Sequence, residues 1–283
     1  MAPRTVLISG CSTGIGRATA VRLARAGWDV FAGVRREEDG ESVRAEAPER
    51  IRPVTLDVTD AATIEAAAAA VREATGTAGL GGLVNNAGVT VQGPLEFLPP
   101  DDLRRQLEVN VVGQIAVTQA VMPEIRAATG RIVNMGSVGG RVAHPMLGPY
   151  AASKFAIEAL TDALRKELRP WGIHVVVVEP GSMATEIWSK GQRGAEQVRE
   201  SIGERGRELY GDALDKIAAI AAKTGERGAS PDKVAKVVER ALTAGRPRTR
   251  YLVGADARAQ VALDTLLPDR AFDAVEARFI ESG

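Results

Sequence analysis

The stretch Thr5-Val-Leu-Ile-Ser-Gly10-Cys-Ser-Thr-Gly14-Ile-Gly16 joins a short apolar run to a glycine-rich turn, and the helix-periodic segment Gly16–Ala26 follows. The apolar run Thr5–Ile8 predicts a buried strand. Glycines between a strand and a helix allow a tight turn and let backbone N–H groups approach a pyrophosphate. A plain strand-to-helix turn is the alternative. No Gly-Lys-Ser/Thr follows, so the turn is not a P-loop.

Short β-branched runs alternate with longer helix-periodic segments along the rest of the chain. Runs such as Val175–Val178 lack a polar and apolar alternation, as expected for strands covered on both faces. The predicted strands are Thr5–Ile8, Asp29–Gly33, Ile51–Leu56, Gly82–Asn85, Gly130–Met135, His174–Glu179 and Thr249–Val253. The predicted helices are Gly16–Ala26, Ala61–Ala74, Asp101–Met122, Ala151–Arg169 and Pro231–Ala244. This order predicts the α/β class, with a Rossmann-type, doubly wound parallel sheet and helices on both faces.

The length of 283 residues suits one large α/β domain or two small ones, and we expect residues 1–283 to form a single dinucleotide-binding and catalytic domain. Residues 182–230 are rich in Gly, Arg, Glu and Ala and predict a substrate-binding insertion. Residues 251–283 form a C-terminal extension that could pack back on the domain or on a second subunit.

The charge balance and the single cysteine restrict the partners and the compartment. The 36 Lys+Arg and 36 Asp+Glu give no net charge, so nucleic acid is not an expected partner. No apolar run approaches the roughly 20 residues of a membrane-spanning helix. Cys11 has no second cysteine to pair with, so we expect a soluble, cytoplasmic protein.

The second predicted strand ends in Arg35-Arg36, at the place where a carboxylate would bind the ribose 2′-hydroxyl of NAD. An arginine there can bind a 2′-phosphate through charge-assisted hydrogen bonds. The sequence therefore favours NADP(H) over NAD(H). The alternative is a solvated strand end, since Glu37, Glu38 and Asp39 follow.

Polar residues also follow the third and fourth predicted strands. They are Asp57-Val58-Thr59 and Asn85-Asn86-Ala87-Gly88. In a doubly wound sheet, ligands bind outside the carboxyl ends of the strands, so both sets fit a cofactor site. Taken singly, the first could be a helix cap and the second only a turn.

Four further residues fit acid–base chemistry: Asn110, Ser137, Tyr150 and Lys154. Tyr150 and Lys154 are four residues apart in a predicted helix and share one face. A phenol with a pKa near 10 is a poor acid or base at neutral pH, and a nearby ammonium stabilises the phenolate. Ser137 follows a strand and could bind a carbonyl oxygen. A tyrosine that packs over a lysine stem is the alternative.

Together these motifs resemble the short-chain dehydrogenase/reductase family over roughly Thr5 to Thr185. The resemblance rests on the glycine-rich turn, the asparagine turn, the segment Tyr150-Ala-Ala-Ser-Lys154 and Pro180-Gly181. The resemblance implies a seven-stranded sheet and a homodimer or homotetramer joined through helices at 101–122 and 151–169. It implies an NAD(P)-dependent oxidoreductase in which Tyr150 is the general acid/base and Lys154 lowers its pKa. By the same resemblance, Ser137 polarises the carbonyl and Asn110 holds a relay water.

The cofactor residues implied are Gly10, Ser12, Thr13, Gly14, Ile15, Gly16, Arg35, Arg36, Asp57, Val58, Asn86, Ala87, Gly88, Tyr150, Lys154, Pro180, Gly181 and Thr185.

The segments Val30–Arg36 and Thr249–Val253 look similar to the hydroxysteroid and retinol dehydrogenase branch, which implies a bulky apolar alcohol or ketone. The expected substrate-lining residues are Ser137, His144, Leu147, Tyr150, Met183 and Trp188. His144 could equally lie on the surface and Leu147 could be plain packing. Reduction of 3-oxoacyl or small hydroxy-acid substrates is an alternative.

Other classes of function fit less well. Ser137 lacks the Gly-x-Ser-x-Gly elbow of a serine hydrolase, and two histidines and one cysteine without ligand spacing predict no metal site. A non-catalytic NAD(P)-binding sensor remains an alternative, although such a protein could have lost Tyr150 or Lys154.

Overall fold

The computed structural model describes residues 3–183 and 198–282, and in 220–227 and 279–282 it describes the backbone alone. The strands of this part form one seven-stranded sheet in the order β3-β2-β1-β4-β5-β6-β7, and all neighbours are parallel. They are β1 Thr5–Ile8, β2 Asp29–Val34, β3 Ile51–Thr55, β4 Gly82–Asn85, β5 Arg131–Met135, β6 His174–Pro180 and β7 Arg250–Val253. The predicted fold class and all seven predicted strands are confirmed.

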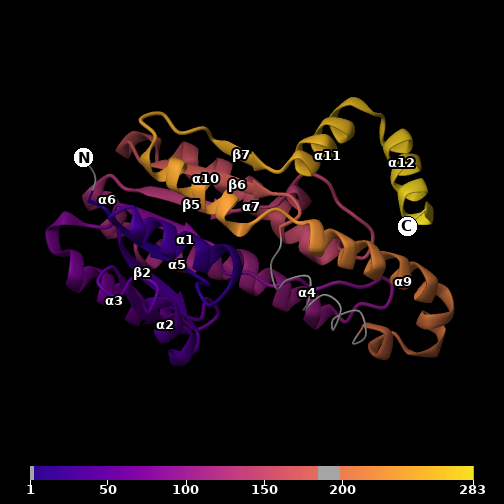
Figure 1. The fold of residues 1–283 in the computed structure, drawn as a ribbon, viewed down its shortest axis with the longest axis horizontal. Coiled ribbons are helices and arrows are strands. Elements are labelled where there is room, and N and C mark those ends of the chain that lie inside the picture. Colours follow the sequence, from indigo (N-terminus) through magenta and orange to yellow (C-terminus); the bar gives the residue numbers. More distant parts are fainter. Residues whose placement is uncertain (1–2, 184–197, 283) are drawn as a thin grey trace.

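Helices cover both faces of the sheet (Figure 1). On one face lie α1 Gly14–Arg25, α2 Glu37–Arg44 and α10 Pro231–Thr243. On the other lie α3 Ala61–Thr75, α5 Gly113–Ala120, α6 Met122–Ala128 and α7 Gly148–Glu167, with α4 Pro100–Leu107 leading into α5. The strand order reverses between β1 and β4, which creates the switch point where ligands bind in such sheets.

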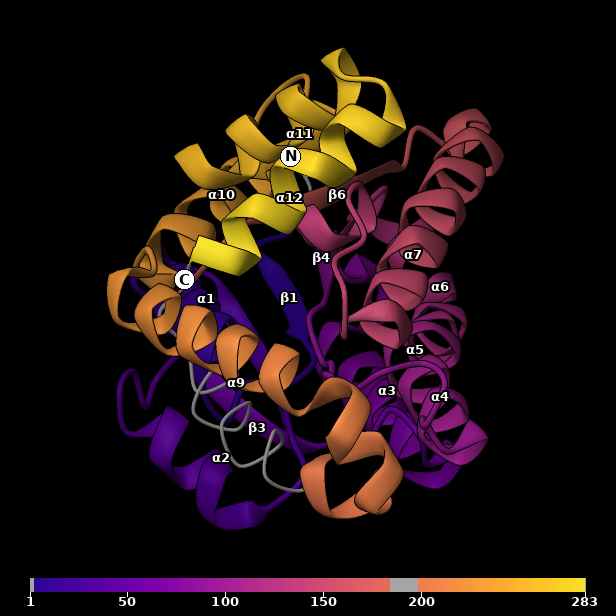
Figure 2. The ribbon, with the colours of Figure 1, turned by 90° about the vertical axis from the view of Figure 1, so that its right-hand side faces the viewer.

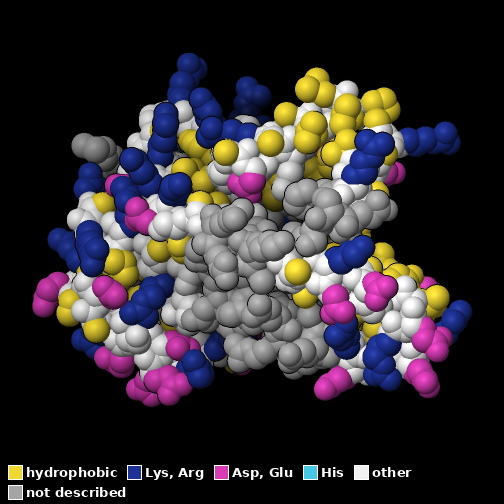
Figure 3. All heavy atoms as spheres, turned by 45° about the vertical axis from the view of Figure 1, so that its right-hand side comes forward, with side chains coloured by type: hydrophobic (Ala, Val, Ile, Leu, Met, Phe, Trp, Pro, Cys, Tyr) yellow, Lys and Arg dark blue, Asp and Glu magenta, His cyan; other side chains and the backbone are white. Residues whose placement is uncertain are grey.

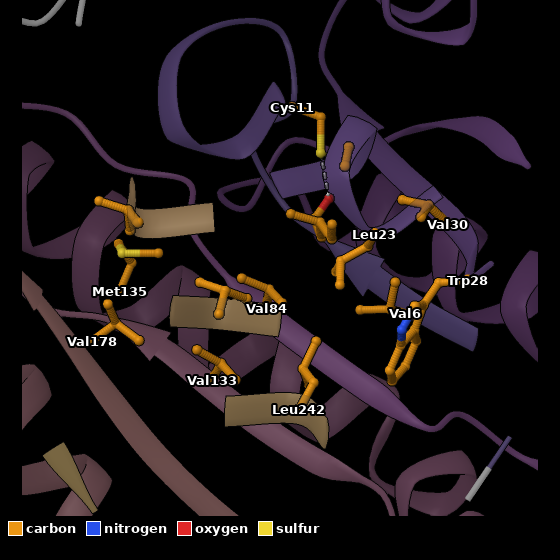
Figure 4. Packing of buried hydrophobic residues seen from close by; sticks show 14 of the residues in the cluster. Val6, Cys11, Leu23, Trp28, Val30, Val84, Val133, Met135, Val178 and Leu242 are labelled. Atoms are coloured by element: carbon orange, nitrogen blue, oxygen red, sulfur yellow. Dashed lines mark hydrogen bonds between the residues drawn. The ribbon is translucent and has the colours of Figure 1, made fainter. Parts of the chain in front are cut away.

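The larger core cluster joins the sheet to α1 and α10. Val6, Val84 and Val133 come from three neighbouring strands and lie beside Leu23 of α1 and Leu242 of α10 (Figure 4). Each is at most 5% exposed. Full burial of such a side chain stabilises the fold by about 1.5–3 kcal/mol, so this packing fixes α1 against the sheet.

A row of buried polar side chains ties the two central strands to helices on the other face. Asn85 Nδ2 donates to Thr118 Oγ1 at 2.8 Å and to Asn134 Oδ1 at 2.9 Å. Asn134 Nδ2 in turn donates to Thr161 Oγ1 at 2.9 Å. These bonds connect α5, β4, β5 and α7 directly below the carboxyl edge of the sheet.

Two helical segments lie beyond that edge (Figure 2). The expected insertion contains α9, Gly203–Arg227, and the C-terminal extension contains α11, Ala255–Leu266, and α12, Asp269–Ser282. Helix α12 contacts α9, and α11 contacts the 3-10 turn Val138–Gly140 that follows β5. The insertion and the C-terminal extension therefore flank the same edge of the sheet.

The sequence patterns did not predict α2, α6, α9, α11 or α12. These helices bury few of their side chains. In α11, Ala257 is the buried residue. The single helix predicted at Asp101–Met122 is wrong in detail, because the π-helical turn Glu108–Val112 separates α4 from α5.

Hydrophobic side chains gather on the C-terminal helices, at the upper right of Figure 3. Leu263, Leu266 and Val275 are among the exposed large apolar residues there. Across the described part of the chain, no helix combines the length and apolar character needed to cross a membrane.

Candidate active site

The glycine-rich turn after β1 is shaped for a close ligand approach. Gly10 and Gly14 have positive φ angles of 72° and 59°. A Cβ on Gly16 would lie 2.1 Å from the Gly10 carbonyl oxygen and 2.5 Å from Asn86 Nδ2. Because no side chain fits there, α1 can begin directly against the turn.

The N-terminus of α1 is free to bind an anion. Thr13 occupies the N-cap position, but its side chain makes no capping hydrogen bond, and the first turn has no acidic residue. The first N–H groups of a helix lack intrahelical partners, and the helix dipole favours negative charge there. Ser12 and Ile15 are half-buried beside this site. The cradle thus fits the pyrophosphate of a dinucleotide.

The two arginines after β2 differ in their surroundings. Arg36 makes a bidentate pair with Asp39, at 2.9 and 3.0 Å, and a second ion pair with Glu38 at 2.9 Å. Arg35 is exposed and forms no ion pair with another described residue, although its charge contributes to lowering the pKa of Asp57. Arg35 is therefore the arginine that is available to a ligand.

Asp57 lies at the carboxyl end of β3 in an Asx turn. Its Oδ1 accepts hydrogen bonds from Thr59 N at 2.9 Å and Thr59 Oγ1 at 2.7 Å, which lower its pKa. Helix α3 is capped by Asp60 instead, so the helix-cap interpretation of Asp57 is wrong. Val58 is buried beneath Gly113 of α5.

The asparagine turn after β4 holds the glycine-rich turn in place. Asn86 Nδ2 donates to the carbonyl oxygens of Ser9 and Gly10, both at 3.0 Å. Ser9 Oγ accepts from the backbone N–H groups of Asn86 and Ala87, also at 3.0 Å. Gly88 at the end of the turn is exposed. Ser9 was not among the predicted site residues.

Asn110 lies in the π-helical turn, and its amide is fully engaged. Its Oδ1 accepts from Val89 N at 2.8 Å, and its Nδ2 donates to Val89 O at 3.0 Å and to Ser153 Oγ at 3.1 Å. Single π-turns are frequent at functional sites. Since both amide hydrogens are used, a relay water would have to be held by an oxygen atom of this residue.

Tyr150 and Lys154 lie on one face of α7, beside Ser137 at the end of β5. Lys154 Nζ is 5.7 Å from the centroid of the Tyr150 ring and donates to Met135 O at 2.8 Å. Burial raises the pKa of Tyr150, and a hydrogen bond with Ser137 opposes that shift. Burial disfavours the charged phenolate, so a nearby ammonium favours it only if the ammonium lowers the pKa of Tyr150 by more than burial raises it.

Lys154 itself is 5% exposed, and burial lowers its pKa to about 8. The negative charge of Glu158, one helical turn away, opposes this shift. The charge state of the lysine thus depends on the groups behind it in the protein core. No pattern in the sequence pointed to these groups.

The segment after β6 is fixed by the C-terminal extension. Gly181 N donates to Val253 O at 2.8 Å, and Ser182 N donates to Asp256 Oδ2 at 2.7 Å. A Cβ on Gly181 would lie 2.5 Å from that carboxylate oxygen. Pro180 is the last residue of β6, whereas Thr185 lies outside the described residues.

The predicted substrate-lining residues have different surroundings. Met183 is 3% exposed and belongs to the main core cluster, whereas Leu147 is half-buried before α7. His144 Nδ1 lies 2.6 Å from Glu276 Oε1 and Nε2 lies 3.3 Å from Gln260 Oε1, so both ring nitrogens contact the C-terminal helices. Trp188 is outside the described residues.

Two further polar residues support the site and were not predicted. Gln106 of α4 accepts from Val91 N at 2.6 Å and donates to Val89 O at 2.9 Å. Ser153 of α7 donates to Tyr150 O at 2.7 Å and accepts from Asn110. In the sequence, Ser153 is a polar residue between Tyr150 and Lys154, but nothing there shows what it contacts.

The sheet, the anion cradle and the tyrosine–lysine pair together define the class of Rossmann-type, nucleotide-dependent oxidoreductases. A model of the short chain dehydrogenase family matches residues 4–196. The chain is 33% identical to the NADPH-dependent 3-dehydrocapnine reductase of Ornithobacterium rhinotracheale, over 96% of this chain and 95% of that protein. It is 37% identical to mouse retinol dehydrogenase 5, over 95% and 86% of the two chains.

Among solved structures, a short chain dehydrogenase from Burkholderia cenocepacia in complex with NADP superposes with a TM-score of 0.74. It is 25% identical, and the match covers 98% of this chain and 97% of that one. The chain belongs to the short-chain dehydrogenase/reductase family. It is an oxidoreductase that acts on alcohol or carbonyl groups.

The close contacts of Gly16 predict the effect of adding a methyl group there. Gly16→Ala forces the turn away from α1, so we expect dinucleotide affinity to fall at least tenfold and the melting temperature to drop. Cofactor fluorescence titration and thermal unfolding measure both effects. Gly245→Ala is the matched control, because no atom lies within 4 Å of its added Cβ. Unchanged affinity in Gly16→Ala would show that the turn does not bind the cofactor.

Proposed function

We propose that the protein transfers hydride between NADP(H) and a carbonyl or secondary alcohol, with Tyr150 as the general acid/base. The observation that carries this proposal is the position of Tyr150, Lys154 and Ser137 at the sheet edge that also carries the anion cradle. The remaining proposed cofactor contacts come from the turns after β2, β3, β4 and β6.

Each proposed catalytic residue has a distinct task. The nicotinamide cofactor supplies or accepts the hydride when bound. Ser137 and Tyr150 hydrogen-bond the substrate oxygen, and Tyr150 donates its phenolic proton to that oxygen during reduction. Lys154 holds a positive charge close to the phenol and favours the phenolate that remains. Asn110 fixes the π-helical turn next to α7 and holds a relay water.

We propose a bulky apolar substrate of steroid or retinoid type. The named function of mouse retinol dehydrogenase 5 supports this class. The 3-dehydrocapnine reductase is a relative with a different named substrate, so the substrate class differs among relatives. Reduction of 3-oxoacyl or small hydroxy-acid compounds is the second candidate. In this proposal residues 1–283 form one domain, and the insertion at about 182–230 lines the substrate site with Met183, Leu147, His144 and Trp188.

Removal of the phenolic hydroxyl tests the acid/base role. Tyr150→Phe should lower kcat about 10²–10⁴-fold while cofactor binding persists, because a positioned acid/base contributes an effect of this size. Initial rates with ketosteroids, retinal, acetoacetyl thioesters and small aryl ketones measure it, with Tyr251→Phe as the matched control. Wild-type turnover in Tyr150→Phe would exclude Tyr150 as the general acid/base. If the wild-type protein binds the cofactor but reduces no carbonyl compound, the result would favour the non-catalytic NAD(P)-binding sensor.

We further propose that NADP(H) is preferred and that Arg35 binds its 2′-phosphate. The relative from Ornithobacterium rhinotracheale is NADPH-dependent by name, and the Burkholderia cenocepacia structure contains NADP. Arg36 is already neutralised by Asp39 and Glu38, so it contributes less.

Separate removal of the two arginines tests this assignment. Arg35→Ala should raise KM for NADPH by about 10- to 100-fold, the value of a charge-assisted hydrogen bond, and leave KM for NADH nearly unchanged. Arg36→Ala is the matched control and should change both constants by less than about threefold. Equal effects of the two substitutions on NADPH, or a wild type that uses NADH alone, would contradict the assignment.

We also propose a cytoplasmic homodimer or homotetramer joined through residues 101–122, which include α5 and most of α4, and through residues 151–169, most of which belong to α7. Phe155 of α7 is 45% exposed and Val112, directly before α5, is 50% exposed, which suits a contact between subunits. The reducing compartment is supported by the single cysteine, Cys11, which is a buried free thiol.

A charge on the proposed subunit contact should separate the subunits. Phe155→Glu should lower the mass of the particle in solution relative to the wild type, because an unpaired carboxylate would be buried in the contact. Light scattering after size-exclusion chromatography measures the mass. Leu266→Glu, at a 79% exposed position on α11, is the control and should keep the wild-type mass. A monomeric wild type, or an unchanged mass in Phe155→Glu, would rule out this interface.

A further inference from the structure

Two buried carboxyl groups lie behind Lys154, and the proposed mechanism does not use them. Glu158 follows Lys154 by one turn of α7 and is 7% exposed, while Glu179 in β6 is 2% exposed. The two carboxyl groups meet at one nitrogen of Arg250, whose Nε lies 3.0 Å from Glu158 Oε2 and 4.0 Å from Glu179 Oε1. Buried acidic residues are rare unless their charges are paired.

Arginines reach this pair from two sides but do not saturate it. Arg250 of β7 donates through Nε to Glu158 Oε2 at 3.0 Å, and the same nitrogen is 4.0 Å from Glu179 Oε1. Its terminal nitrogen donates to Asp162 Oδ2 at 2.8 Å instead. Arg141 NH1 lies 3.4 Å from Glu179 Oε1. The guanidinium hydrogens are therefore directed mainly to one oxygen of each carboxyl group.

The second oxygen of Glu158 has no donor. Oε1 is buried and receives no hydrogen bond from any residue that the structure describes. Glycines form the wall beside it, since a Cβ on Gly136 would lie 3.1 Å from this oxygen and one on Gly140 would lie 3.3 Å from Glu158 Cγ. A buried acceptor without a partner is unfavourable. A proton on either carboxyl group would supply the missing donor.

We propose that Glu158 and Glu179 share one proton and act as positioning residues for Lys154, because the charge behind the lysine depends on that proton. The proposal rests on the catalytic role assigned to Lys154 in the proposed function. The shared proton forms an O–H···O hydrogen bond between the two carboxyl groups, as in other closely spaced acid pairs. Loss of this proton adds a negative charge one helical turn from the ammonium.

The surrounding charges place this ionisation in the physiological range. Burial and the Glu179 charge raise the pKa of Glu158 to about 7, against the opposing effect of Arg250. The charged and titratable groups facing the pair are Lys154, Asp162 and Arg165 of α7, Arg141 after the 3-10 turn and Arg250 of β7, with Tyr150 one turn beyond Lys154. Asp162 is already held ionised, because Arg250 and Arg165 lower its pKa.

The first test measures the shared proton without using activity. The folded chain binds the Glu158 proton more tightly than the unfolded chain, whose pKa is near the usual 4.5, so this stabilisation is lost as pH rises through about 7. Glu158→Gln cannot ionise. Its melting temperature relative to the wild type should therefore rise from pH 5 to about pH 7 and level off above that pH.

Two further variants make this test specific. Glu179→Gln removes the other member of the pair and should show the same trend. Asp162→Asn removes a carboxylate that pairs with Arg250 and stays ionised throughout this range. The difference in melting temperature between this variant and the wild type should therefore be constant from pH 5 to pH 8. A flat difference for both glutamate variants would overturn the shared proton, whatever the enzyme turns out to catalyse.

The second test asks whether the pair acts on Lys154. Above pH 7 the wild type carries one more negative charge behind the lysine than Glu158→Gln does. This charge raises the pKa of Lys154, and the ammonium that it preserves favours the Tyr150 phenolate. The acid limb of kcat/KM for alcohol oxidation should therefore move to higher pH by about half a unit in Glu158→Gln, which is about threefold in rate at a fixed pH on that limb.

Asp162→Asn should leave the acid limb in place, because Asp162 is two helical turns from Lys154. Coincident profiles of the wild type and Glu158→Gln would overturn the positioning role even if the melting temperatures reveal the shared proton. If no alcohol is oxidised, the proposed function fails, and the melting-temperature series still decides whether the proton is shared.

Discussion

The hydrogen bonds of the Asn110 amide hold together the three segments on which the catalytic side of the molecule depends. Through Val89 this amide fixes the loop after β4, through Ser153 it fixes α7, and its own backbone forms the π-helical turn between α4 and α5. Ser153 in turn bonds to Tyr150 O. The position of the tyrosine thus follows from one buried amide, and an aliphatic residue at 110 could not replace its three bonds.

A second constraint is the burial of charge next to the phenol. Lys154 Nζ donates a hydrogen bond to Met135 O, and burial lowers the pKa of the lysine to about 8. A lysine in such a place changes its charge easily, so nearby carboxylates become important to it. The Glu158–Glu179 pair and Arg250 supply this environment and connect β7, the last strand, to the proposed catalytic helix.

The proposed cofactor side and the proposed substrate side of the edge are built differently. The proposed cofactor side consists of backbone and short polar side chains, such as those in the Ser9–Asn86 contacts. On the proposed substrate side, α9, α11 and α12 are held by surface contacts, including His144 with Glu276 and Tyr210 Oη with Glu96 at 2.8 Å. Such contacts can vary between relatives without disturbing the sheet, which fits a family whose members act on different alcohols and ketones.

The sequence by itself determined the seven strands, their parallel arrangement and the motif residues at the carboxyl edge, because buried runs and glycine turns are local signals. It did not determine α9, α11 and α12, whose faces are mostly exposed, or the π-helical turn at Asn110. Only the tertiary structure distinguished Arg35 from Arg36 and brought Glu158, Glu179 and Arg250 together behind Lys154. Those contacts join residues up to 92 positions apart in the sequence. Their energies depend on burial and on distance in space, and neither can be read from a local sequence pattern.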